Sequence, residues 1–195
     1  MRLAIEAAAF SLFAEQGYDA TTVGEIAERA EVSETTFFRY FPSKADLILS
    51  DHDAQLPALL QAIRERPSTE NDLVAVRRAL LEAWVAAIDP QRTARNARAI
   101  ATSYLLRGMT YDIGLSWHST ISDAIAQRRG QDAVDERCAL IAWMALSIFG
   151  GSLQRWLDHG CVADLAAEVE QGFDLMTQLC REGPPIASGD GPLIP

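Results

Sequence analysis

Two short amphipathic helices separated by a three-residue turn are the feature that most constrains this chain. The stretches 23–30 and 34–41 carry apolar residues at helical spacing, and Glu31, Val32 and Ser33 lie between them. A third amphipathic stretch precedes them, over residues 3–16. This order predicts a small three-helix unit that contains a helix-turn-helix pair.

Local residues mark the start of each helix of the pair and the end of the second. Thr22 precedes the first of the pair and Glu25 follows three residues later, which is a capping-box arrangement. Ser33 is a natural N-cap for the second helix. Pro42 stops that helix, because its ring cannot continue the hydrogen-bond ladder. The boundaries are therefore predicted by local chemistry alone.

The 3.6-residue period also divides the side chains of the pair into two faces. One face is apolar and is expected to be buried, and the other is polar and is expected to face outward. The expected buried residues are Val23, Ile26, Ala27, Ala30, Val32, Phe37 and Phe41, and the expected outward residues are Thr35, Thr36, Arg39 and Tyr40.

The rest of the chain also predicts helices, with no sustained alternation typical of strands. A fourth helix is expected over 44–64, followed by a polar hinge over 64–72. Further helices are expected over 73–88, 91–107, 111–129, 133–158 and 162–180. The fold class is all-α, and the Pro- and Gly-rich residues 181–195 are expected to form a disordered tail.

Composition narrows the class of protein. Apolar residues make up 49% and charged residues 23% of 195 residues, which is ordinary for a globular chain. The three cysteines are far apart, so neither a zinc site nor a disulfide framework is predicted. The start of the chain lacks the pattern of an export signal, and the uncharged stretch 138–154 predicts a buried helix rather than a membrane span. We therefore expect a cytoplasmic protein with no membrane partner.

The segment Ala7–Ile48 closely resembles the N-terminal domain of the TetR family of transcriptional regulators. The resemblance rests on the pattern "LF..GY..TTV..IA..A.VS..TFFRYFPSK..L", which is nearly complete here. It implies a DNA-binding helix-turn-helix domain over residues 1–48. It also implies a helical ligand-binding and dimerisation domain over residues 49–180.

The same resemblance assigns DNA contacts residue by residue. Thr22 would meet a phosphate at the start of its helix, and Thr36 and Arg39 would lie in the major groove. Tyr40 and Lys44, the single lysine of the chain, would each meet a phosphate. The complete set of expected DNA-binding residues is Thr22, Ser33, Thr35, Thr36, Phe38, Arg39, Tyr40 and Lys44.

Two residues depart from the family pattern. Glu31 stands in the turn where the family usually has Gly, and a non-Gly residue with positive φ costs about 1 kcal/mol. Glu34 begins the recognition helix and would repel phosphate. Residues 1–50 contain four cations and eight carboxylates, a formal charge of 4 − 8 = −4. We therefore expect modest, strongly salt-dependent affinity, with a homodimer reading a palindrome through two recognition helices.

The second domain carries most of the large aromatic residues. Its layout looks, more loosely, like the TetR branch described as acyl-CoA-like ligand binding. A helical bundle with several rings and a buried Arg can hold a small, largely apolar effector. The candidate effector-binding residues are Trp84, Tyr104, Arg107, Trp117, His118 and Trp143, although aromatic residues at helical spacing are more often core.

The last two helices are the expected dimer interface. Adjacent glycines inside a helix cost roughly 2 kcal/mol of helix propensity, so close packing of helices offers a reason for them. The candidate interface residues are Ile148, Phe149, Gly150, Gly151 and Leu153.

These observations favour a ligand-responsive, DNA-binding repressor released from a palindromic operator by a small effector. The alternative is a helical ligand-binding or protein-interaction module with weak or lost DNA binding, which the acidic first domain motivates. An enzyme is not expected, because the sequence contains no nucleophile elbow, zinc-protease, P-loop or dinucleotide motif. No catalytic residue, metal or cofactor is predicted.

Overall fold

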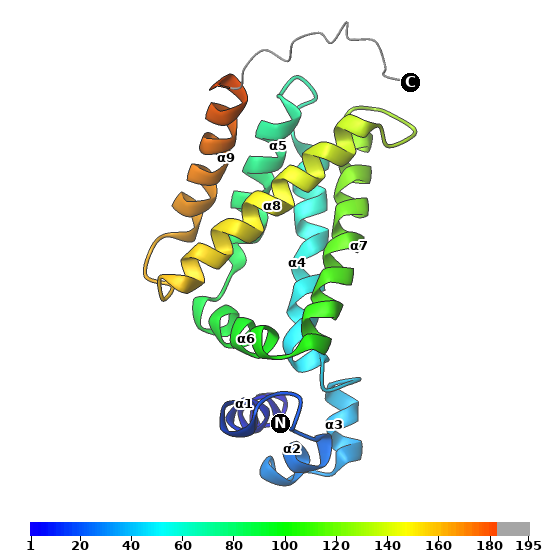
Figure 1. Ribbon diagram of the computed structural model, residues 1–195. Helices are drawn as coiled ribbons and strands as arrows, with labels where there is room; N and C mark the ends of the chain where they lie inside the picture. The colour runs from blue at the N-terminus through cyan, green and yellow to red at the C-terminus, as the bar shows by residue number, and fades with distance from the viewer. Residues whose placement is uncertain (183–195) are drawn as a thin grey trace, which may run out of the picture.

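A computed structural model describes residues 1–182 of the chain, apart from the side chains of residues 51–54. All regular elements within this range are helical (Figure 1). The α-helices are α1 (Arg2–Gln16), α2 (Val23–Arg29), α3 (Glu34–Tyr40), α4 (Asp46–Glu65), α5 (Asp72–Ala79), α6 (Pro90–Thr102), α7 (Tyr104–Arg128), α8 (Glu136–Asp158) and α9 (Leu165–Glu182). The all-α prediction is confirmed.

Two hydrophobic cores organise these helices. The first lies among α1, α2, α3 and the start of α4, and it includes the fully buried side chains of Ile5, Ile26 and Phe37. The second lies among α4, α5, α7, α8 and α9. Figure 1 shows α1–α3 as a small unit at one end of the bundle, with α6 lying across the boundary. Ala99 of α6 and Leu106 of α7 belong to the first core, so the two units are packed together.

The segment after α5 departs from regular α-helix. It continues as a π-helical turn, η1 (Leu80–Trp84), and a 3₁₀ turn, η2 (Val85–Ala87). Asp89 then caps α6 by accepting hydrogen bonds from the backbone N–H groups of Gln91 and Arg92, and Pro90 takes the first helical position. The prediction of one regular helix over 73–88 was therefore wrong in its second half.

The helix break expected between residues 107 and 111 was also wrong. The chain breaks instead at Ser103, which has extended backbone between α6 and α7. The Ser103 hydroxyl accepts from the Leu106 N–H at 3.2 Å and donates to Asp19 Oδ1 at 2.7 Å. A contact between distant parts of the chain thus fixes this boundary.

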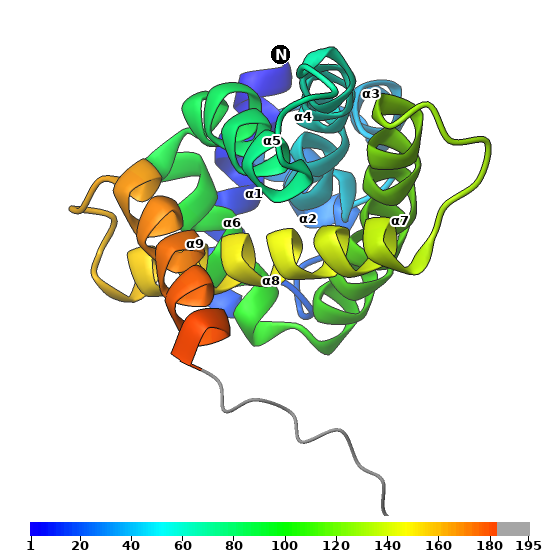
Figure 2. The same cartoon turned by 90° about the horizontal axis from the view of Figure 1, so that it is seen from above.

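The apolar helix α8 crosses the bundle between α7 and α9 (Figure 2). Among the described residues, α8 is the helix whose length and composition would allow it to cross a membrane. Cys138, Ala142 and Ala145 on its inner face are buried in the second core. The helix is not a membrane span. The expectation of a buried helix holds for one face of α8 only, because Leu140 and Trp143 on the other face are exposed.

The predicted tail begins at residue 181, but α9 runs through Glu182, so its first two residues are helical. Residues 183–195 lie outside the described range.

Candidate nucleic-acid interface and effector site

The helix-turn-helix pair is built as its capping residues predict. The Thr22 hydroxyl accepts from the Glu25 N–H at 3.2 Å, and the Glu25 carboxylate accepts from the Thr22 N–H at 2.7 Å. The Thr22 hydroxyl also donates to the Glu25 carboxylate at 2.8 Å, and this bond and the one from the Thr22 N–H are the largest causes that lower the pKa of Glu25. Ser33 caps α3 by accepting from the Thr36 N–H at 3.1 Å. Both helices therefore start where local chemistry satisfies their free N–H groups.

The turn takes the backbone conformation that the family resemblance implies. Glu31 has φ of 55°, in the left-handed region where glycine is favoured. The Glu31 N–H donates to Glu28 O at 3.0 Å, and the Val32 N–H donates to Ala27 O at 2.9 Å. These bonds tie the turn that leads into α3 to the end of α2.

The predicted division into buried and outward faces is largely observed. Ile26, Ala27, Phe37 and Phe41 are buried, and the other three predicted apolar residues are partly buried against the same core. The outward residues of α3 differ in exposure. Thr35, Phe38 and Arg39 are exposed, whereas Thr36 and Tyr40 are partly buried.

Arg39 is the α3 cation that is available to a polyanion. Its guanidinium lies 5.3 Å from the centre of the Tyr40 ring, and it forms no ion pair among the described residues. Arg29 on α2 is instead held by Glu15 of α1 at 2.8 Å. The Arg29 guanidinium and the Ser11 hydroxyl lower the pKa of Glu15 to about 2. Arg39 is therefore better placed than Arg29 to meet bases or phosphates.

Lys44 lies in the turn before α4 rather than at the start of the helix, which begins at Asp46. Its ammonium group donates to the carbonyl oxygens of Tyr18 at 2.7 Å and Thr21 at 2.6 Å. It also lies 4.1 Å from the centre of the Tyr18 ring. Burial lowers the pKa of Lys44 and raises that of Tyr18 to about 12. Lys44 therefore holds the α1–α2 loop in place, and its role at a phosphate stays a prediction.

Two of the carboxylates of residues 1–50 have partners within the fold. Glu6 is buried beside Arg2 of its own helix and Arg92 of α6, and Asp19 accepts from Ser103. Glu34 stays exposed, and its Oε1 lies 3.0 Å from the point where a side chain at Gly24 would begin. The Glu34 carboxylate thus lies against the first turn of α2, beside the predicted phosphate position.

Comparisons with known proteins agree with this geometry. Residues 5–50 match the family described as bacterial regulatory proteins, tetR family, and residues 70–180 match the family described as MftR C-terminal domain. The chain belongs to the TetR family of bacterial transcriptional regulators. It is therefore a DNA-binding regulator and not an enzyme.

Two relatives show how far the similarity extends. MftR of Mycobacterium tuberculosis, named for the regulation of mycofactocin biosynthesis, is 28% identical over 176 residues, which cover 86% of this chain and 85% of that protein. TcmR of Streptomyces glaucescens is 47% identical over 68 residues, but these are 35% of this chain and 30% of that protein.

Solved structures of TetR-type regulators share the fold. SmeT, the repressor of a Stenotrophomonas maltophilia multidrug efflux pump, aligns with 100% of this chain and 98% of its own, with a TM-score of 0.57 and 18% identity. FadR of Thermus thermophilus, solved with lauroyl-CoA, aligns over 100% of both chains with a TM-score of 0.51 and 24% identity.

The effector candidates of this TetR-family chain fall into three groups. Trp84 and Trp117 are buried together, with ring centres 4.7 Å apart, and Trp84 also lies 5.3 Å from Phe149. His118 and Trp143 stack at 4.1 Å on the outer side of α7 and α8, where His118 Nε2 lies 3.0 Å from Ala139 O.

Tyr104 and Arg107 form the third group of candidates, at the start of α7. Tyr104 is 84% exposed, and the Arg107 guanidinium covers its ring at 4.3 Å. The six candidates therefore do not line one cavity. Only Trp84 and Trp117 lie inside the bundle, and they pack there as core residues.

The five dimer candidates differ in exposure. Gly150 and Gly151 are exposed, and Ile148 and Leu153 are partly buried. Phe149 points into the protomer, with 6% exposure, because it packs on Trp84. Leu140 and Trp143 of α8 and two leucines of α9, Leu175 and Leu179, are also exposed in the protomer.

The contact glycine within the protomer is Gly172 of α9, which the sequence did not single out. A methyl group at Gly172 would lie 2.7 Å from Ile148 Cγ2 and 3.1 Å from Ser152 Oγ, so α8 and α9 approach closely there. At Gly150, by contrast, a methyl group would meet nothing within 4 Å of the same protomer.

The residues that join the two units were missed as well. Asn96 of α6 donates to the carbonyl oxygen of Ile48 at 3.1 Å, and Arg92 lies 3.6 Å from Glu6. No local pattern could reveal these pairs, because the partners are far apart in the sequence. Ser103 did carry a signal, since a serine before an apolar helical run is a common N-cap.

Proposed function

We propose that this protein is a homodimeric repressor that reads a palindromic operator through α3 and releases it when a small, largely apolar effector binds the helical domain. The exposed α3 face, with Thr35, Phe38 and Arg39 beside one another, is the observation that carries the proposal. A dimer places two such faces on one side of the DNA, about 34–36 Å apart. This doubling offsets the weak attraction expected from an acidic chain.

The effector part of the proposal rests on the family and its solved members. SmeT has been solved with triclosan, and FadR of Thermus thermophilus with lauroyl-CoA. We propose that residues 1–48 read DNA and that residues 49–180 bind effector and partner. The six effector candidates remain proposals, and Trp84 and Trp117 are the pair among them that packs inside the bundle. As a DNA-binding regulator, the protein is expected to work in the cytoplasm.

Dimerisation is proposed to use the outer face of α8 and α9. Leu140, Leu175 and Leu179 are each more than half exposed in the protomer, and their burial in a dimer would be favourable. Gly150 and Gly151 would let the partner approach closely. Gly150→Arg should yield monomers in light scattering, with Gly114→Arg, an open helical glycine outside the proposed interface, as the matched control. A G150R variant that remains dimeric would contradict this interface.

The DNA-binding proposal is tested by selecting target sequences from random DNA with the full-length protein. A palindrome is expected, and the Arg39→Ala variant should lose about 1–3 kcal/mol of specific binding per recognition helix. The control is Arg181→Ala, at the far end of α9. If no selective, salt-sensitive binding appears at low ionic strength, the chain is the ligand-binding module without DNA-binding activity.

The sign of regulation is read by transcription in vitro from a promoter that carries the selected site. Repression is expected. FasR of Mycolicibacterium smegmatis, 26% identical over 168 residues, is named a transcriptional activator, so activation is the outcome that would overturn this part.

A further inference from the structure

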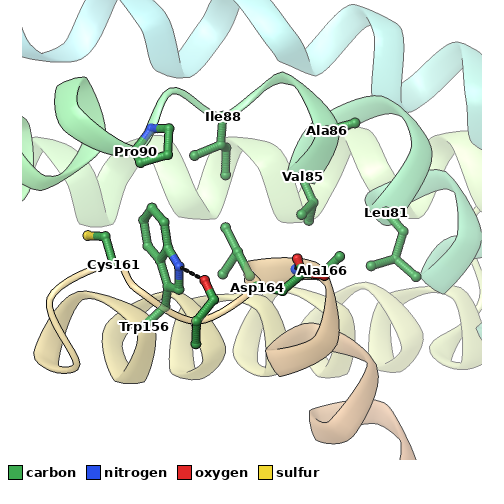
Figure 3. Close-up of a pocket in the computed structure, with 11 residues that line it drawn as sticks. Leu81, Val85, Ala86, Ile88, Pro90, Trp156, Cys161, Asp164 and Ala166 are labelled. Atoms are coloured by element: carbon green, nitrogen blue, oxygen red, sulfur yellow. Dashed lines mark hydrogen bonds between the residues drawn. The ribbon is translucent and has the colours of Figure 1, made fainter.

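A pocket of about 310 Å³ lies between the irregular segment after α5 and the turn that joins α8 to α9. Leu81, Val85 and Ile88 form one wall, and Trp156 and Ala166 belong to the other (Figure 3). The Trp156 indole N–H donates to Ala163 O at 2.7 Å, so the ring offers the pocket an apolar surface with its polar group satisfied. The space is at the lower end of the range for small-molecule sites.

This pocket is separate from the aromatic cluster in the bundle core. Trp84 belongs to the same irregular segment, but its ring packs on Trp117 and Phe149 and does not line the pocket. The wall is built from π-helical and 3₁₀ turns rather than regular helix. Such turns lack the full ladder of α-helical hydrogen bonds, so they can adjust to a ligand at lower cost.

The lining residues also define the chemistry of the ligand. The charged residue among them is Asp164, an exposed carboxylate that caps α9 by accepting from the Ala166 N–H at 2.9 Å. A carboxylate at the rim repels an anionic group and tolerates a neutral or cationic one. The remaining lining is aliphatic, aromatic or a thiol, apart from backbone atoms.

Helix α6 connects the pocket to the DNA-binding unit. Ile88 and Pro90 line it, and Pro90 is the first residue of α6. Further along, α6 is tied to the first unit by the Asn96 bond to Ile48 O and by the Arg92–Glu6 ion pair. The Arg95 guanidinium also lies 3.6 Å from the centre of the Phe10 ring of α1. A ligand that displaces residues 85–90 would therefore move the helix that holds the DNA-binding unit.

We infer that this pocket is an effector site for a compact apolar molecule that is neutral or carries a single amine, and that its occupation weakens operator binding through α6. The inference rests on the proposed function, because it names the site and the chemical class of the effector. The pocket lies at a different position from the six effector candidates proposed above.

The test uses the full-length dimer and the neutral fluorescent probe N-phenyl-1-naphthylamine. We expect saturable binding, displaced by decanol and by decylamine, with decanoate at least tenfold weaker. Ala166→Phe places a ring in the pocket and should weaken probe binding at least tenfold. Ala167→Phe is the matched control, because the neighbouring alanine is exposed and does not line the pocket, and it should change binding less than twofold.

A charge variant gives a second, independent measurement. Asp164→Asn keeps the oxygen that caps α9 but removes the negative charge. It should bring decanoate to within about threefold of decanol while leaving decanol binding unchanged. Thermal melting of each variant checks that the fold is intact. Equal probe binding by the A166F and A167F variants, or an unchanged preference against decanoate in the D164N variant, would overturn the inference.

Operator binding is measured in parallel, so that the two proposals fail separately. Decanol should weaken operator binding by the wild type and not by the A166F variant. If the protein binds its selected DNA with no response to decanol or decylamine, the pocket inference fails and the DNA-binding function stands. If the probe binds as expected but no DNA is selected, the proposed DNA-binding function fails while the pocket stands.

Discussion

The Nζ atom of Lys44 lies 2.7 Å from the carbonyl oxygen of Tyr18. Tyr18 precedes the helix-turn-helix pair in the sequence, and Lys44 follows it. The same ammonium group lies over the Tyr18 ring and donates to Thr21 O. A lysine that would be assigned to DNA from the family pattern is therefore also an internal support. Its two carbonyl contacts fix the loop that leads into α2.

Lys44→Met should destabilise the DNA-binding unit by roughly 1–3 kcal/mol, because two partly buried carbonyl groups lose a charged donor. Urea unfolding of the full-length protein measures this loss. Arg39→Met is the matched control, since it removes an exposed cation that has no ion pair among the described residues, and it should leave stability within about 0.5 kcal/mol. Equal effects of the two substitutions on stability would contradict the supporting role of Lys44.

Glu34→Gln should strengthen DNA binding. The Glu34 carboxylate lies against the first turn of α2, so its removal takes away one negative charge near each predicted phosphate contact. We expect severalfold tighter binding to both specific and random DNA at low salt, and a smaller gain as salt screens the charge. Fluorescence anisotropy over a salt series provides the measurement.

Glu65→Gln, at the distant end of α4, has the same effect on net charge and should change affinity little. A weaker complex with the E34Q variant would show instead that Glu34 contacts a base, for which a cytosine amino group is the matching donor.

Gly172→Ala should destabilise the protein by about 1–3 kcal/mol, because the added methyl group would lie 2.7 Å from Ile148 Cγ2. Thermal or urea unfolding reports the change. Ile148→Ala in the same chain should recover part of the loss, since it removes the side chain that the methyl group meets. No recovery would mean that the strain lies in the helix backbone rather than in this contact.

Gly150→Ala is the comparison for Gly172→Ala. A methyl group there meets nothing in the protomer, and alanine improves helix propensity by about 1 kcal/mol. The free energy of unfolding of the isolated protomer, measured at low concentration, should therefore be higher than that of the wild type. A loss of dimer by the same substitution would place Gly150 in direct contact with the partner.

The ion pair between Glu15 and Arg29 should make stability depend on pH in the acid range. Hydrogen bonds from Arg29 and Ser11 lower the pKa of Glu15 from 4.5 to about 2 in the folded protein. The unfolded chain thus binds this proton more tightly, so the contribution is present above pH 4.5 and is lost as pH falls toward 2. The unfolding midpoint of wild type and of the Glu15→Gln variant should differ at pH 6 and converge near pH 2. A constant difference across this range would exclude the ion pair as its cause.

The helix-turn-helix unit was predictable because its determinants are local. The Thr22–Glu25 capping box and the Ser33 cap each join residues within one helical turn of one another. The left-handed backbone at Glu31 was implied by the family resemblance, because the family usually has Gly at this position. The apolar period of α2 and α3 then determines which face is buried. These signals are independent of the rest of the chain, so the observed structure agrees with them closely.

The second domain was less predictable, because its boundaries depend on contacts between distant residues. The sequence suggested a helix break between residues 107 and 111, but the break lies at Ser103, which is held by Asp19, 84 positions earlier. Tyr104 and Arg107, expected in a pocket, lie on an exposed face of α7 as a result. Phe149 was assigned to an outer surface, although its ring completes the core against Trp84.

The sequence by itself determined that this chain is helical, that it begins with a helix-turn-helix, and that residues of α3 face outward. Those properties follow from hydrogen-bond capping and side-chain periodicity, which act over a few residues. Only the tertiary structure decided that Lys44 supports the α1–α2 loop, that Gly172 is the contact glycine, and that α6 joins a pocket to the DNA-binding unit. Each of these depends on which distant groups share a small volume, and helical periodicity does not encode that information.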